Sequence, residues 1–160
     1  MISGSDAAIT LGALRRVLLG ILLFGMAGTT TELLLLQHLE DVSQAIPLAL
    51  LGCGYAVVAW NSWRHSQLSV TAMQIVMVLF AASGVLGMYF HYSANAEFQR
   101  EIDPTLAGSK LWWTVLQAKT PPALAPGVMA LLGLIGLAYA YRHPATAVRG
   151  ELLQENRNEL

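Results

Sequence analysis

Charge and cysteine are both scarce in this chain of 160 residues. Charged side chains make up 12% of the sequence against 55% hydrophobic residues, and the formal net charge is −1. Without a basic patch or a run of like charges, the sequence indicates neither a nucleic-acid partner nor a polybasic lipid-binding tail. The single cysteine, Cys53, excludes an internal disulfide and a CxxC motif, and we expect it to be a small buried residue.

Signatures of catalysis are absent as well. The sequence contains no GxSxG motif, no Walker loop, no dinucleotide-binding fingerprint after a strand and no Ser-x-x-Lys motif. An enzyme is therefore not the favoured interpretation, and no cofactor is favoured either.

The chain is rich in long apolar stretches. Its mean hydropathy is +0.53, and four runs approach the roughly 20 residues with which a helix crosses a bilayer. The first run is too long for a signal peptide and no Ala-x-Ala cleavage site follows it, so we expect it to be retained. The sequence predicts an all-α integral membrane protein, a single four-helix transmembrane bundle with a polar C-terminal tail. The predicted spans are 17–36, 46–63, 70–89 and 123–141, and the tail is 144–160.

Lysine and arginine indicate the orientation of these spans, because basic residues gather on the cytoplasmic side of a membrane. In a four-span arrangement one side carries Arg15, Arg16, Arg64, Arg142, Arg149 and Arg157, and the other carries Arg100, Lys110 and Lys119. We therefore predict a multi-pass protein of the cell membrane, taken to be a bacterial inner membrane, with both termini in the cytoplasm.

The connection between the third and fourth spans, 93–122, is unusually long, and long connections often carry function or structure of their own. Within it, residues 106–118 place Leu111, Val115 and other apolar residues at helical spacing. We predict a short interfacial helix in this external loop, with Trp112 and Trp113 as anchors at headgroup level.

Small residues recur inside the predicted spans. In lipid, helices associate through close van der Waals contact, which small residues permit. The sequence therefore predicts tight helix crossings and argues against a wide aqueous pore. The glycines assigned to helix packing are Gly52, Gly84, Gly87, Gly133 and Gly136.

Glu32 is an acid inside the first apolar run, and such residues are costly in lipid and often functional. On a helix, Gly25, Thr29 and Glu32 share one stripe, which can face the bundle interior and hold a proton or a cation. The competing interpretation is a structural residue that lies close enough to the interface to reach water.

Histidines and carboxylates lie together near the external ends of the first and third spans. His38 and Asp41 stand one helical turn apart, and His91 precedes Glu97, which makes a divalent metal site between these loops physically possible. A haem alternative also stays open, because His38 and His91 end spans on one side and His65 and His143 end spans on the other.

Three functional hypotheses follow. The favoured one is an accessory or scaffold subunit that associates with other membrane proteins, or with copies of itself, inside the lipid bilayer. The first alternative is a metal- or haem-binding redox protein that uses His38, Asp41, His91 and Glu97. The second is a small proton-coupled transporter centred on Glu32.

Overall fold

The structure is a computed structural model that describes residues 4–35, 42–118 and 124–145. These residues form five helices and no strand. The protein is therefore all-helical, as the sequence predicts. In chain order the helices are α1 (Gly4–Leu35), α2 (Val42–Trp63), α3 (Gln67–Ile102), α4 (Gly108–Leu116) and α5 (Leu124–Ala140).

Three of the helices are long and apolar enough to cross a membrane, namely those over Ser5–Leu35, Ala45–Trp63 and Gln67–Ile102. The fourth apolar helix, α5, has 17 residues and is shorter than the roughly 20 residues that a span usually needs. The four apolar runs of the sequence correspond to α1, α2, α3 and α5. The prediction of a membrane protein is thus confirmed in that three helices are long and apolar enough to cross a bilayer.

The third helix differs most from the sequence prediction. The apolar run predicts a helix that ends near Tyr89 with a loop from Ser93, whereas α3 continues to Ile102 and has Asp103 as its C-cap. That prediction is wrong because hydropathy marks where a helix leaves an apolar solvent, not where its hydrogen bonding stops. Residues 93–102 contain no glycine or proline and several good helix formers, and the first helix breaker is Pro104.

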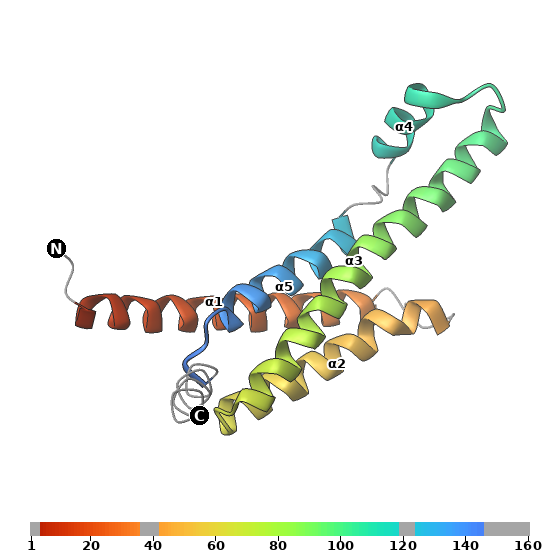
Figure 1. The fold of residues 1–160 in the computed structure, drawn as a ribbon. Helices are drawn as coiled ribbons and strands as arrows, with labels where there is room; N and C mark the ends of the chain where they lie inside the picture. The colour runs from red at the N-terminus through yellow and green to blue at the C-terminus, as the bar shows by residue number, and fades with distance from the viewer. Residues whose placement is uncertain (1–3, 36–41, 119–123, 146–160) are drawn as a thin grey trace, which may run out of the picture.

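The helices α3 and α5 form the most extensive pair and run antiparallel (Figure 1). Gln74 of α3 donates a 3.5 Å hydrogen bond to the carbonyl of Ala140, at the end of α5. Near the start of α5, Pro126 and Ala130 lie against Gly84 of α3. The whole of α5 therefore lies along the first half of α3, while α2 also packs against α3 and α1 crosses α5.

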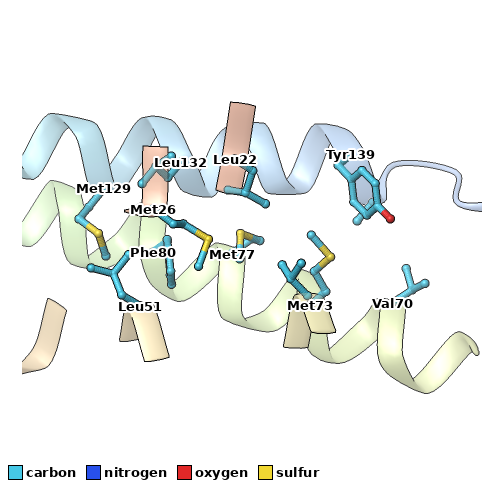
Figure 2. Close-up of a cluster of buried hydrophobic side chains, with 12 residues drawn as sticks. Leu22, Met26, Leu51, Val70, Met73, Met77, Phe80, Met129, Leu132 and Tyr139 are labelled. Atoms are coloured by element: carbon cyan, nitrogen blue, oxygen red, sulfur yellow. The ribbon is translucent and has the colours of Figure 1, made fainter. Parts of the chain in front are cut away.

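A single hydrophobic core joins these four helices (Figure 2). Methionine recurs in it, and this flexible, unbranched side chain fills irregular gaps between crossing helices. The core includes residues from α1 (Leu22, Met26), α2 (Leu51, Val58), α3 (Val70, Met73, Met77, Phe80) and α5 (Met129, Leu132, Tyr139, Ala140).

The outside of the helices is also apolar. Phe24 is 82% exposed and Trp63 is 91% exposed, which is unlike the surface of a protein that folds in water. Cys53 lies on this outer surface, so the expectation that it is buried is wrong. The physical reason is that an apolar residue of a helix in lipid gains nothing from being inside the protein.

The short helix α4 folds back onto the extended end of α3 (Figure 1). Leu111 and Val115 of α4 are buried in a second small cluster with Ala96 and Leu106, and Tyr92 packs against it. The helix predicted within 106–118 is present as Gly108–Leu116, and its apolar side faces α3.

Candidate functional site

Glu32 and Thr29 lie on different parts of the surface of α1. Thr29 is buried, and its hydroxyl donates a 2.9 Å hydrogen bond to the carbonyl of Gly25 on the same helix. Thr30 and Thr31 bond their own helix in the same way. Glu32 is exposed and makes no hydrogen bond or ion pair with any residue that the structure describes. The three threonine hydroxyls therefore donate their protons to backbone carbonyls of α1, and the carboxylate of Glu32 faces away from the core.

The predicted metal cluster is only partly within the described residues. His38 and Asp41 lie outside them, while His91 and Glu97 are both exposed on α3. Glu97 lies six positions after His91, which is about 9 Å along the axis and on a different face of the helix. Over the described ranges no group of three or more histidine, cysteine, aspartate or glutamate residues is placed to hold a metal. The site that combines these residues with His38 stays a prediction.

The two tryptophans of α4 point away from α3. Trp112 and Trp113 are 47% and 57% exposed, and their rings meet edge to face with centroids 5.1 Å apart. Leu111 and Val115 on the opposite side of α4 hold the helix to α3. The arrangement leaves both indole rings available to an interface.

The five glycines assigned to packing have different surroundings. Gly84, Gly133 and Gly136 are buried where α3 and α5 cross, and a Cβ on Gly133 would lie 2.6 Å from the backbone nitrogen of Ala81. Gly87 faces Pro126, whereas Gly52 is exposed on α2 with nothing within 4 Å of an added Cβ. Close packing at these glycines therefore lies within the chain, and Gly52 is not part of it.

A buried polar network that the sequence analysis did not single out joins α2, α3 and α5. Asn61 and Ser69 are almost fully buried, and the hydroxyl of Ser69 lies 3.1 Å from the Asn61 side-chain oxygen and 2.7 Å from the Arg64 carbonyl. The Asn61 amide donates to the hydroxyl of Tyr139 at 3.2 Å. Because each buried polar group has a partner, the network fixes how the three helices meet at this end.

The network borders an open pocket of about 560 Å³, which we call the basic pocket. Two arginines, two histidines and Tyr139 supply its charged and titratable side chains, and no carboxylate is among its described lining residues. Arg15 donates to the carbonyls of Tyr141 and Arg142 at 3.2 and 2.7 Å, so it caps the end of α5. The pocket is lined by Gly12, Arg15, Arg16, Leu19, Ser62, His65, Tyr139, His143, Pro144 and Ala145.

The surroundings of His143 in this pocket disfavour its charged form. Burial lowers the pKa of His143 below its ordinary value of 6.5, and the nearby Arg15 and His65 lower it further. The backbone N–H of Ala145 donates to Nδ1 of His143 at 3.3 Å, which requires that nitrogen to carry no proton. The ring of His65 lies nearly parallel to that of His143, at 20° and with centroids 6.3 Å apart. The structure thus brings together the two histidines considered above as one possible haem pair.

The basic pocket combines two guanidinium groups, two imidazoles and a phenol from segments far apart in the sequence. These groups donate hydrogen bonds and carry or accept protons, but none of them is an activated nucleophile. The predicted gathering of arginines at one end of the apolar runs was the signal in the sequence that could have located the pocket. The chain matches no family model, no curated protein and no solved structure.

Proposed function

We propose that this protein is a four-span protein of the cell membrane that acts as an accessory subunit by binding another membrane protein along α1. In this proposal α1, α2, α3 and α5 cross the bilayer and both termini lie in the cytoplasm, as the distribution of arginine and lysine favours. The antiparallel packing of the shorter α5 along α3 supports its inclusion as a span.

The observation that carries the proposal is how little of α1 the rest of the chain covers. Only 6% of its most apolar stretch is buried, against 22% for α2 and 28% for α3. The N-terminal end of α1 also extends away from the other helices (Figure 1). Because lipid can also cover an apolar helix, this exposure alone does not distinguish a protein partner from lipid. The polar and small residues on the surface of α1 make that distinction.

Two kinds of residue on α1 favour a protein partner over lipid. Glu32 is exposed, and an acid within a span is stabilised when a neighbouring protein group bonds or pairs with it. Gly20 and Gly28 are exposed, with nothing within 4 Å of an added Cβ, on either side of the 82% exposed Phe24. Glycines without a neighbour let a second helix approach the backbone closely.

The test replaces Gly28 by leucine in tagged protein and compares the membrane proteins that co-purify in mild detergent. We expect the recovered partner to fall several-fold, because the leucine blocks close approach to α1 at a position where an added Cβ has no described atom within 4 Å. Gly52→Leu is the matched control, since Gly52 is also exposed, lies on α2 and has nothing within 4 Å of an added Cβ.

Glu32→Gln provides a second variant, and a photo-crosslinking residue at Phe24 shows whether the contact is direct. Crosslinks to a different protein support a hetero-partner, and crosslinks between two differently tagged copies support self-association. If Phe24 crosslinks only to lipid and partner recovery is the same for Gly28→Leu and Gly52→Leu, α1 is not a docking surface.

A further inference from the structure

The basic pocket has an excess of positive charge with no acidic side chain to balance it among its described lining residues. Arg15 and Arg16 come from α1, His65 from the turn after α2, and His143 from the segment after α5. Arg16 makes no hydrogen bond or ion pair with a described residue. Side chains that converge from three parts of the fold without a carboxylate leave a place for an external anion.

The structure also holds the donors of the pocket in position. Arg15 uses one terminal nitrogen to bond two carbonyls at the end of α5, so its remaining N–H groups have a fixed direction. Tyr139 is buried, and because its hydroxyl accepts a hydrogen bond from Asn61 it keeps its own proton to donate. Pre-oriented donors lose little entropy on binding, which distinguishes this pocket from exposed arginines elsewhere.

The position of the pocket along the helices indicates where the anion comes from. Arg15 and Arg16 directly precede the apolar run of α1, and His143 lies three positions after the end of α5. If these helices cross the bilayer, the pocket lies at headgroup level on the arginine-rich side. Basic pockets between membrane helices on the cytoplasmic side bind the headgroups of anionic lipids.

We propose that the basic pocket binds a phosphate group, with an anionic phospholipid headgroup as its source. The guanidinium groups of Arg15 and Arg16 bond the phosphate oxygens, and His65 and the hydroxyl of Tyr139 donate the remaining hydrogen bonds. Leu19, which belongs to the apolar run of α1, also lines the pocket, and the acyl chains of the lipid extend past it toward the bilayer. Inorganic phosphate has the same oxygen chemistry without these chains, so the experiment includes both sources.

The test measures the thermal shift of the purified full-length protein in a non-ionic detergent. Phosphatidylglycerol, diacylglycerol with the same acyl chains, and inorganic phosphate are titrated separately. Arg16→Gln combined with His65→Gln removes two of the phosphate contacts at exposed positions, where the fold tolerates the change. Arg100→Gln is the control, because Arg100 is an exposed arginine at the far end of α3.

For the wild-type protein and Arg100→Gln we expect stabilisation by phosphatidylglycerol and none by diacylglycerol. The double variant should bind phosphatidylglycerol at least about tenfold more weakly, since each lost bond to a charged group is worth roughly that factor. Native mass spectrometry of the same samples counts the bound lipid.

The remaining outcomes distinguish a lipid headgroup from a soluble phosphate as the ligand, and they include the results that would overturn the proposal. Stabilisation by inorganic phosphate that is also lost in the double variant supports a phosphate site with a soluble ligand. Equal stabilisation by phosphatidylglycerol and diacylglycerol, or a phosphatidylglycerol affinity that the double variant leaves unchanged, overturns the proposal. Neither result depends on whether α1 binds a protein partner.

Discussion

At the scale of single residues, His143 shows how burial and neighbouring charge act on one side chain. Its side chain is 6% exposed, and its ring centroid lies 5.8 Å from that of Tyr139. It lines the basic pocket together with Arg15 and Arg16 of α1 and His65 of the turn after α2. A proton on this imidazole would break the Ala145 hydrogen bond and place a third positive charge beside the two arginines. The folded protein therefore binds that proton less readily than the unfolded chain does.

The stability of the protein should consequently fall with pH in a defined window. Above the unfolded pKa of about 6.5 both states are neutral at His143, and the shift contributes nothing to the pH dependence. As the pH drops below that value, His143 takes up its proton in the unfolded chain before it does so in the folded protein. The free energy of unfolding therefore decreases until the pH reaches the lower pKa of the folded protein. We expect the melting temperature in detergent to decrease between about pH 7.5 and about pH 5.5.

His143→Gln should reduce this decrease, because the glutamine does not titrate. His91→Gln is the control, since His91 is exposed on α3 and away from the basic pocket. Only the slope of melting temperature against pH is compared, so a general loss of stability in one variant does not affect the result. Parallel slopes for His143→Gln, His91→Gln and the wild-type protein would contradict the role given to His143.

Sequence analysis could select unusual residues but not their neighbours. Glu32 stands out as an acid in an apolar run, yet its exposure depends on where the other helices end, which no periodicity reveals. Asn61 is equally unusual within its own run and lies at the centre of a buried network. Its partner Tyr139 is 78 positions away, and a contact across that separation follows only from the packing of α2 against α5.

At the scale of elements, the crossing of α3 and α5 depends on glycine. A Cβ at Gly84 would overlap the backbone nitrogen of Ala130 and lie 2.6 Å from the carbonyl oxygen of Pro126. Both are backbone atoms, so the clash can be relieved only by moving one helix away from the other. The small residues that the sequence analysis assigned to packing therefore include one that allows two backbones to meet.

Gly84→Ala should destabilise the protein by about 1–3 kcal/mol, the usual effect of overpacking a close contact. Gly52→Ala is the matched control and should be neutral or stabilising, because its Cβ meets nothing and alanine favours helix over glycine. Thermal or denaturant unfolding in detergent measures both. Equal stability of the two variants would mean that α3 and α5 are not in contact at Gly84.

The elements also show what hydropathy can and cannot predict. It located α1, α2, α3 and α5 because apolar runs of that length have few other uses. Hydropathy could not locate the end of α3, because α3 continues beyond its apolar run and α4 packs there against Tyr92 and Ala96. It also could not separate glycines that pack inside the chain from those, such as Gly28, that have no neighbour.

At the scale of the whole molecule, the open question of architecture is whether α5 crosses the membrane. Its 17 residues span about 26 Å, slightly less than the roughly 30 Å of a hydrocarbon core. It nevertheless lies antiparallel along α3, from Gln74 beside Ala140 to Gly84 beside Pro126. That part of α3 falls inside its apolar run, so α5 should occupy the same depth of the bilayer.

Accessibility labelling tests this arrangement. In a Cys53→Ser background, we expect Ser109→Cys at the start of α4 to react with a membrane-impermeant maleimide in intact cells. Ala7→Cys near the start of α1 and Pro144→Cys after α5 should react only after permeabilisation, because an even number of crossings returns the chain to the arginine-rich side. All three positions are exposed in the structure, so reactivity reports on the membrane and not on burial. If Pro144→Cys reacts together with Ser109→Cys in intact cells, α5 does not cross, and the basic pocket cannot lie at a single membrane surface with Arg15 and His143 side by side.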